Sequence, residues 1–187
     1  HAHGTDGMVG ALNAGVDSIE HGNFGNAQTD ALFKKTGAYF VPTMLAPKTA
    51  LDQARAGARS KASLEKAETA AKAAMDNHKR AIANGVKIAF GTDTGVSAHG
   101  DNGKEFALMV SVGMTPTEAI KAATVNAADL LGRSSSIGTL EAGKDADIIA
   151  VASSPLADVT QLERPTFVMH RGIVARIGGQ RAPFPPN

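Results

Sequence analysis

Histidines and one aspartate are the residues of this chain whose types and positions best suit chemistry. His1 and His21 each stand at the carboxyl end of a predicted strand, and Asp93 ends another. Neutral imidazole and carboxylate groups are ligands for zinc and similar divalent ions. The chain has no cysteine, which excludes disulfides and thiolate chemistry. We therefore interpret His1, His21 and Asp93 as candidate metal ligands.

These residues depend on elements that alternate between strand and helix. Polar and apolar residues alternate over 16–22, a short apolar run occupies 38–43, and "VKIAFGTD" at 86–93 predicts a further strand. Strands that alternate with helices are typical of a parallel sheet, and the chemistry of a βα-barrel lies at the carboxyl ends of its strands. The predicted helices lie within residues 4–15, 27–37, 47–84, 102–113 and 115–132.

The pattern changes after Gly132. An apolar run at 148–151 is followed by a hairpin, with strands at 166–170 and 173–177 around the turn Arg171-Gly172. Strands without helices between them predict a small separate β layer, and the last residues form a poorly ordered tail. The expected segments are a barrel part at 1–132, a β-sandwich part at 133–180 and a tail at 181–187.

The composition is that of a soluble globular protein. Of 187 residues, 43% are hydrophobic and 20% are charged, so a packed core is expected. A net charge of +1, without a basic run, argues against nucleic acid as the partner. No apolar stretch reaches the roughly 18 residues of a membrane helix, so no membrane partner is expected. Because the first residue is histidine, we expect the C-terminal part of a longer protein, and the compartment, cytoplasmic or exported, stays open.

Several motifs occur in a characteristic order. They are "HAHG" (1–4), "AGVDSIEHG" (14–22), "GVKIAFGTDTG" (85–95), the segment 99–132 that begins "HGDNGKEF", and "GTLEAGKDADIIAV" (138–151). Together they resemble the amidohydrolase superfamily, in its imidazolonepropionase- and prolidase-like (Xaa-Pro dipeptidase, ochratoxinase-like) branch, from His1 to about Ile177. The resemblance implies an α/β fold: a (β/α)8 TIM barrel, of which this chain supplies the C-terminal half (strands five to eight), with the C-terminal strands of a composite β-sandwich.

The resemblance also implies a binuclear metal centre. Members of the superfamily usually hold two divalent ions, here expected to be Zn²⁺, bridged by a carboxylated lysine and a hydroxide. His1 corresponds to the fifth-strand ligand, His21 to the sixth-strand ligand and Asp93 to the eighth-strand ligand. Asp93 is also the expected catalytic residue, which moves a proton from the attacking hydroxide to the leaving nitrogen. The first-strand His-x-His pair and the bridging lysine are expected in an upstream half.

Two further histidines are candidate substrate-binding residues. His3 falls where related sequences place a residue beside the metal; alternatively it orients His1. His99, on the loop after Asp93, faces the substrate by resemblance; the alternative is an exposed loop residue. A different interpretation makes His1 and His3 the first-strand pair, but "IEHG" follows too soon for that.

The implied reaction is hydrolysis of an amide or cyclic amide C–N bond by a metal-bound hydroxide. The substrate would be a small molecule or dipeptide, such as an Xaa-Pro dipeptide, an N-acyl amino acid or a lactam. Loops 42–60 and 94–103 would set specificity, with Arg55 and Arg59 either engaging a carboxylate or forming a solvated helix face. The apolar side chains expected to line the first loop are Met44, Leu45 and Leu51.

Two alternatives belong to other classes. In the first alternative, the chain alone is a non-catalytic half-barrel that needs an upstream half, and the isolated fragment is inactive. A deaminase of the same superfamily differs in its leaving group and usually uses one metal with an additional Glu/His pair, which is not evident here. At full length the protein is expected to form a homo-oligomer.

Overall fold

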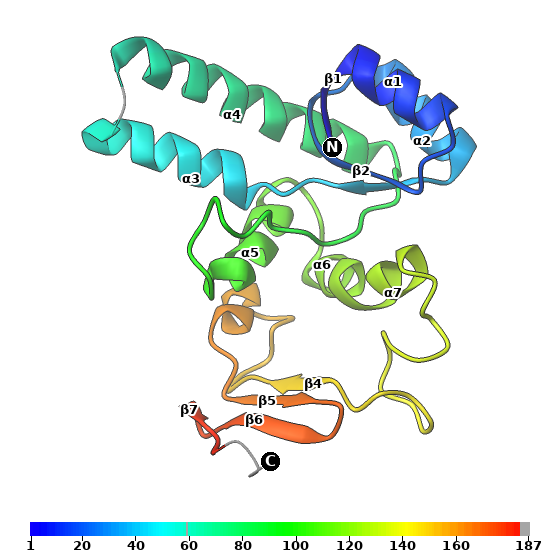
Figure 1. The fold of residues 1–187 in the computed structure, drawn as a ribbon, viewed down its shortest axis with the longest axis vertical. Helices are drawn as coiled ribbons and strands as arrows, with labels where there is room; N and C mark the ends of the chain where they lie inside the picture. Colours follow the sequence, from blue (N-terminus) through cyan, green and yellow to red (C-terminus); the bar gives the residue numbers. More distant parts are fainter. Residues whose placement is uncertain (59, 184–187) are drawn as a thin grey trace.

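The computed structural model describes residues 1–58 and 60–183, which form two sheets with helices between and around them (Figure 1). The upper part holds the parallel sheet β1-β2-β3, and the lower part holds the sheet β4-β5-β6-β7. The elements are β1 (Ala2–Gly4), α1 (Thr5–Asn13), β2 (Ser18–Phe24), α2 (Ala27–Thr36), β3 (Tyr39–Val41), α3 (Leu45–Gln53), η1 (Ala54–Ala58), α4 (Lys61–Ala83), η2 (Asp101–Gly103), α5 (Lys104–Ser111), α6 (Pro116–Lys121), η3 (Ala122–Asn126), α7 (Ala127–Leu130), β4 (Ile148–Ala150), η4 (Val159–Glu163), β5 (Phe167–His170), β6 (Ile173–Ile177) and β7 (Gln180–Arg181).

Strand β2 changes partner along its length. Its first half pairs with β3, with Ser18 opposite Tyr39, and its second half pairs with β1, with His21 opposite Ala2. Both pairings are parallel, as the alternation of strands and helices predicts. His21 therefore lies at the point where β2 leaves one neighbour and joins the other.

The strand predicted at 86–93 is reduced to a single parallel bridge between Phe40 and Ile88. The ladder cannot continue along β3, because Pro42 follows that strand and has no N–H to donate. Beyond the bridge the main chain bonds to helical segments instead. The Phe90 N–H donates to the Ala122 carbonyl at 3.1 Å.

Two apolar clusters of buried residues occur in the described part of the chain. The smaller comprises Tyr39, Val41 and Ala89, and the larger joins the parallel sheet to its helices. Ile19 and Phe40, both 1% exposed, contribute from β2 and β3. Helix α2 begins with an Asn26–Thr29 capping box and ends at Gly37, whose main chain is in the left-handed region. The remaining buried members of the cluster are Met8, Leu12, Phe33, Ala38, Met44, Ala81, Val86, Ile88, Met109, Val112, Met114, Ala119 and Ala122.

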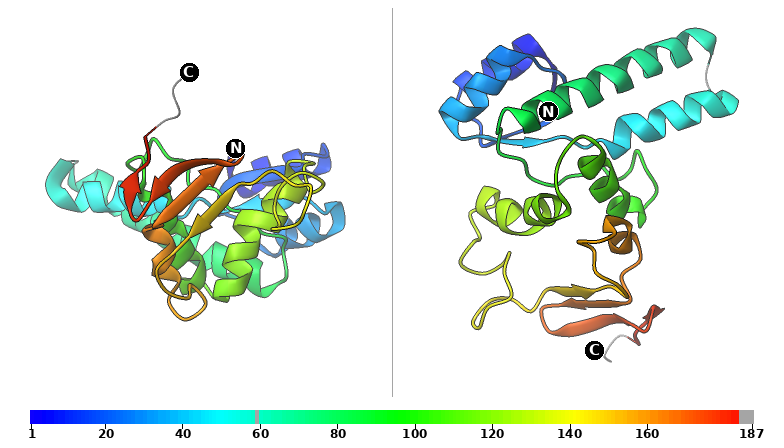
Figure 2. Two further views of the ribbon diagram at one scale, coloured as in Figure 1. Left: turned by 90° about the horizontal axis from the view of Figure 1, so that it is seen from below. Right: turned by 180° about the vertical axis from the view of Figure 1, so that it is seen from behind.

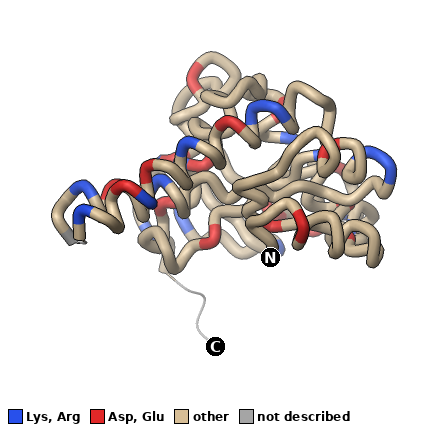
Figure 3. The backbone as a smooth tube through the Cα atoms, turned by 90° about the horizontal axis from the view of Figure 1, so that it is seen from above, with Lys and Arg blue, Asp and Glu red and all other residues tan. Residues whose placement is uncertain are grey.

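The segment predicted as loop 42–60 is largely helical. Helix α3 runs from Leu45 to Gln53, and Gly57, at φ 82°, reverses the chain into α4, so the two helices form an arm that projects from the body (Figures 1 and 2). Basic and acidic residues alternate along this arm (Figure 3), and Arg55 pairs with Glu68 at 3.2 Å. The single long helix expected within 47–84 is divided into α3 and α4, because Gly57 adopts the left-handed conformation and breaks it.

The lower sheet is antiparallel, and its hairpin is confirmed. Strands β5 and β6 are joined by Arg171 and Gly172, at φ 48° and 79°, the double left-handed turn that suits the twist of a two-residue hairpin. The segment assigned to the tail begins inside β7, because Arg181 pairs with Arg176 of β6. The expected tail residues 184–187 lie outside the described residues.

Candidate metal-binding and catalytic site

Three imidazole rings converge where β1 and β2 pair. The His1 and His21 ring centroids are 4.3 Å apart, those of His1 and His3 4.7 Å, and those of His3 and His21 4.9 Å. His1 and His3 are separated by two positions, so an extended chain points both toward the same side. The parallel register of Ala2 with His21 then brings all three rings together.

Left-handed backbone marks this edge of the sheet. His21, Thr43 and Asp93 have φ of 75°, 48° and 53°. Thr43 and Asp93 follow extended segments, whereas His21 lies inside β2, which continues to Phe24 instead of ending at His21 as predicted, because its second half pairs with β1. Among the described residues, the only other non-glycine position with positive φ is Arg171, in the hairpin turn. Non-glycine residues seldom adopt this conformation, and such strain gathers at functional sites.

The hydrogen bonds of His21 decide which ring nitrogen carries its proton. The Thr43 hydroxyl donates to the Pro42 carbonyl at 2.8 Å, so toward His21 its oxygen can only accept. His21 Nδ1, at 2.7 Å from Thr43 Oγ1, must therefore be the donor. The Nε2 atom of the neutral ring is then left with a free lone pair.

The surroundings of His21 disfavour the charged form of its ring. Burial lowers the pKa of His21, and the positive charge of His3 lowers it further, while the Asp93 carboxylate opposes both effects. A neutral imidazole with a free Nε2 lone pair is the form that binds a first-row divalent ion. The donor chemistry of His21 thus suits a metal of that kind.

Helix α4 bonds to the main chain of His21 and Gly22. His78 Nε2 lies 3.0 Å from the His21 carbonyl oxygen, and Asn77 Nδ2 donates to the Gly22 carbonyl. Burial lowers the pKa of His78 to about 4, so its ring is neutral and donates from Nε2. Thr43 and Asn77 are positioning residues that no local sequence pattern indicated, because each acts on a strand end far away along the chain.

The two other predicted site residues, Asp93 and His99, are exposed, unlike His21. Asp93 is exposed and acts on His21 through its charge. The loop after it is held by Asn102, whose amide donates to Thr92 Oγ1 at 3.0 Å and to Thr94 Oγ1 at 2.6 Å. His99 is exposed, and among the described residues the ring contacts of the cluster do not include it.

The residues predicted to set substrate specificity include both buried and surface side chains. Met44, at 1% exposure, belongs to the core cluster, whereas Leu45, at 4% exposure, also lines a cavity between α3 and α5. Arg55 is paired with Glu68. Arg59 lies outside the described residues. Within residues 1–58 and 60–183, no three His, Cys, Asp or Glu side chains make up a complete metal-binding group. The ligand roles of His1, His21 and Asp93 accordingly stay predictions.

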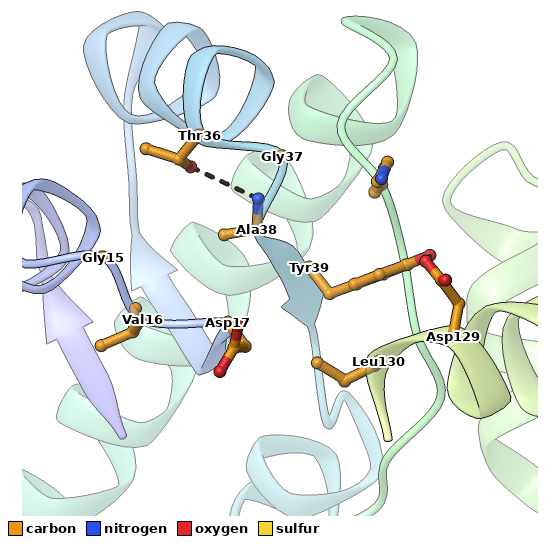
Figure 4. A pocket seen from close by; sticks show the side chains of 10 residues that line it. Gly15, Val16, Asp17, Thr36, Gly37, Ala38, Tyr39, Asp129 and Leu130 are labelled. Carbon is orange, nitrogen blue, oxygen red and sulfur yellow. Dashed lines mark hydrogen bonds between the residues drawn. The ribbon is translucent and has the colours of Figure 1, made fainter. Parts of the chain in front are cut away.

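A cavity of about 260 Å³ lies at the other, amino ends of the strands (Figure 4). Tyr39 extends along it to Asp129, with the phenol oxygen 2.6 Å from Oδ2 (Figure 4). Burial, together with this hydrogen bond and the charge of Asp129, raises the pKa of Tyr39 to about 12. Since the two groups satisfy each other and no residue of the imidazole cluster lines the cavity, we assign the cavity no part in the chemistry.

Comparison with known proteins decides the family. The sequence model of the amidohydrolase family matches residues 1–175. The chain belongs to the amidohydrolase family. Ochratoxinase from Aspergillus niger is 36% identical over 172 residues, which cover 91% of this amidohydrolase chain and 35% of that enzyme. The crystal structure of a Xaa-Pro dipeptidase with bound methionine in its active site matches at 40% identity and a TM-score of 0.88, over 94% of this chain and 44% of that one.

A third relative covers a shorter stretch. Imidazolonepropionase from Geobacillus thermodenitrificans is 41% identical over 73 residues, which are 37% of this amidohydrolase chain. The resemblance to the imidazolonepropionase- and prolidase-like branch is thereby confirmed, as is the α/β fold. The chain spans about a third to a half of the length of the relatives that it matches over most of its own length. In the described part of the amidohydrolase chain, no helix is long and apolar enough to cross a membrane.

Proposed function

We propose that the protein hydrolyses an amide or cyclic amide C–N bond with the help of bound divalent metal ions. The observation that carries the proposal is the convergence of His1, His3 and His21, with the lone pair of His21 Nε2 left free by Thr43. The names of the relatives, ochratoxinase and Xaa-Pro dipeptidase, support this class of reaction. The substrate classes that suit it are Xaa-Pro dipeptides, N-acyl amino acids and lactams.

The architecture that we propose is the C-terminal half of a (β/α)8 barrel with part of a β-sandwich. Residues 1–132 would form the barrel part, 133–180 the sandwich part and 181–187 a tail. Two features support an upstream half: β1 is an edge strand, and the lower sheet leaves apolar side chains uncovered. These side chains are Ile149, Ile173 and Ile177, at 51%, 51% and 60% exposure. A homo-oligomer at full length remains part of the proposal, with light scattering as its test.

Each candidate site residue would have a separate role in the hydrolysis. His1, His21 and Asp93 would hold one or two divalent ions, Zn²⁺ being suited to this donor set, together with ligands and a carboxylated lysine from an upstream half. Bound there, the metal would lower the pKa of a water and polarise the scissile carbonyl. Asp93 would take the proton of the attacking water and deliver it to the leaving nitrogen. His3, beside the cluster, and His99, on the loop after Asp93, would face the substrate.

Metal content of the full-length protein tests the proposal. We expect about two divalent ions per chain, lost in His21→Ala and in Asp93→Ala, together with hydrolysis of Xaa-Pro dipeptides or N-acyl amino acids. His170→Ala is the matched control, because His170 lies in the lower sheet and pairs with Asp147 instead. A full-length protein without stoichiometric metal would refute the catalytic assignment and favour a non-catalytic barrel. Release of ammonia from the substrate ring would point to a deaminase.

A further inference from the structure

Glu105 is a fully buried acid whose carboxylate accepts hydrogen bonds from two main-chain N–H groups. Its exposed fraction is 0%, and it lies on α5. Oε1 accepts from the Met44 N–H at 2.8 Å, and Oε2 accepts from the Leu45 N–H at 2.7 Å. A glutamate is rarely buried completely unless it has partners of this kind. Burial raises the pKa of Glu105 to about 7 in spite of the two amides, which lower it.

The two amides directly follow a strained residue. Thr43 has φ 48°, a conformation that a β-branched residue seldom adopts, and it is 2% exposed. Such a conformation persists only when its surroundings hold it. The carboxylate of Glu105 holds the next two residues of the chain, so it restrains the turn in which Thr43 sits.

Thr43 in turn contacts the ring of His21. Its Oγ1 atom accepts from Nδ1 at 2.7 Å while its hydroxyl proton goes to the Pro42 carbonyl. A rotation of the Thr43 main chain would move both bonds together. The path from Glu105 to His21 therefore consists of three consecutive residues and four hydrogen bonds, all of them among buried groups.

We propose that Glu105 is a positioning residue that, by binding the Met44 and Leu45 amides, keeps Thr43 in the conformation that fixes His21 as the Nδ1–H tautomer. The Nε2 atom of His21 is then left unprotonated. The inference rests on the proposed function only in so far as that nitrogen is meant to bind a metal.

Glutamine at position 105 is the sharpest perturbation, because its shape is nearly that of glutamate. One end of its amide still accepts a hydrogen bond, but the NH₂ end cannot, so one main-chain N–H loses its partner. Glu118→Gln is the matched control. Glu118 likewise accepts a main-chain N–H, from Thr115 at 2.7 Å, but it caps α6 at the protein surface and has no contact with Thr43 or His21 among those described.

The test uses the full-length protein, stripped of metal, with ¹⁵N-labelled histidine at pH 8. The ring ¹⁵N shifts report which nitrogen is protonated, and the His21 signals are assigned by their loss in His21→Ala. We expect the Nδ1–H tautomer in the unmutated protein and in Glu118→Gln, and a mixture of tautomers in Glu105→Gln. The affinity for Zn²⁺ should fall about 10- to 100-fold in Glu105→Gln alone.

Two results would overturn the inference. One is a Glu105→Gln protein that is less stable but keeps the His21 tautomer and the Zn²⁺ affinity, which would make Glu105 merely structural. The other is an unchanged tautomer in Thr43→Val, which keeps the β-branch and removes the hydroxyl, and with it both the acceptor for His21 Nδ1 and the bond to the Pro42 carbonyl. This variant decides the question even if Glu105→Gln fails to fold. Since the tautomer is measured without metal or substrate, an inactive protein would refute the proposed function and leave this result standing.

Discussion

Replacement of Gly22 by alanine tests how closely the main chain beside His21 packs against the apolar core. Gly22 follows His21 and has φ 54°, in the left-handed region. A Cβ atom there would lie 2.5 Å from Phe40 Cε2 and 3.2 Å from Met8 Sδ. Phe40 cannot swing aside, because its ring is 1% exposed and its centroid lies 5.2 Å from that of His78.

The destabilisation has two separable parts. Holding an alanine in the left-handed conformation costs about 1–2 kcal/mol. Forcing a methyl group into the packed ring adds about 1–3 kcal/mol, so Gly22→Ala should lower the free energy of unfolding by about 2–5 kcal/mol. Gly37→Ala carries only the first part, since Gly37 has φ 77° and a Cβ atom there would meet nothing within 4 Å.

Equilibrium urea unfolding of the full-length protein and both variants measures the two parts. We expect Gly22→Ala to be less stable than Gly37→Ala by at least about 1 kcal/mol, which is the overpacking contribution alone. Equal losses in the two variants would refute the reasoning, since they would mean that Phe40 and Met8 yield to the added methyl group without cost.

Three further perturbations address buried charges and hydrogen bonds. Because its folded pKa of about 7 lies above the ordinary value of 4.5, Glu105 binds its proton more tightly when folded, so stability should fall by about 3 kcal/mol as pH rises from 4.5 to 7. Urea midpoints against pH check this, and an equally steep fall in Glu105→Gln would contradict it. Tyr39→Phe, which removes the 2.6 Å bond to Asp129, should destabilise by about 1–2 kcal/mol in urea unfolding; an unchanged midpoint would contradict it. Asp30→Asn weakens a 2.9 Å ion pair between Arg80 and a carboxylate that is 3% exposed, and thermal unfolding should register a loss of about 2–4 kcal/mol; a loss below about 0.5 kcal/mol would show the pair to be no stronger than a surface one.

Local sequence determined the features that depend on neighbouring residues. The stop of α2 at Gly37 and the hairpin at Arg171-Gly172 follow from backbone preferences that act within a few residues. Alternating strands and helices predicted the parallel pairing of β2, and the ordered motifs predicted the family. Positions His1, His21 and Asp93 could be singled out because strand ends are where parallel sheets gather polar side chains, whereas a role for His3 beside the substrate is indicated only by the resemblance to the family.

Tertiary structure decided the rest. The Nδ1 partner of His21 lies 22 residues away, its main-chain partner His78 lies 57 residues away, and Glu105 lies 60 residues from Leu45. Hydrophobic periodicity carries no information about which distant polar groups will meet. The reduced strand at 86–93 has the same origin, since a strand exists only where a neighbour offers unpaired amides and carbonyls, and that depends on how far β3 continues. The types of the candidate ligands are thus encoded locally, whereas the tautomer and orientation of His21 result from packing between distant elements.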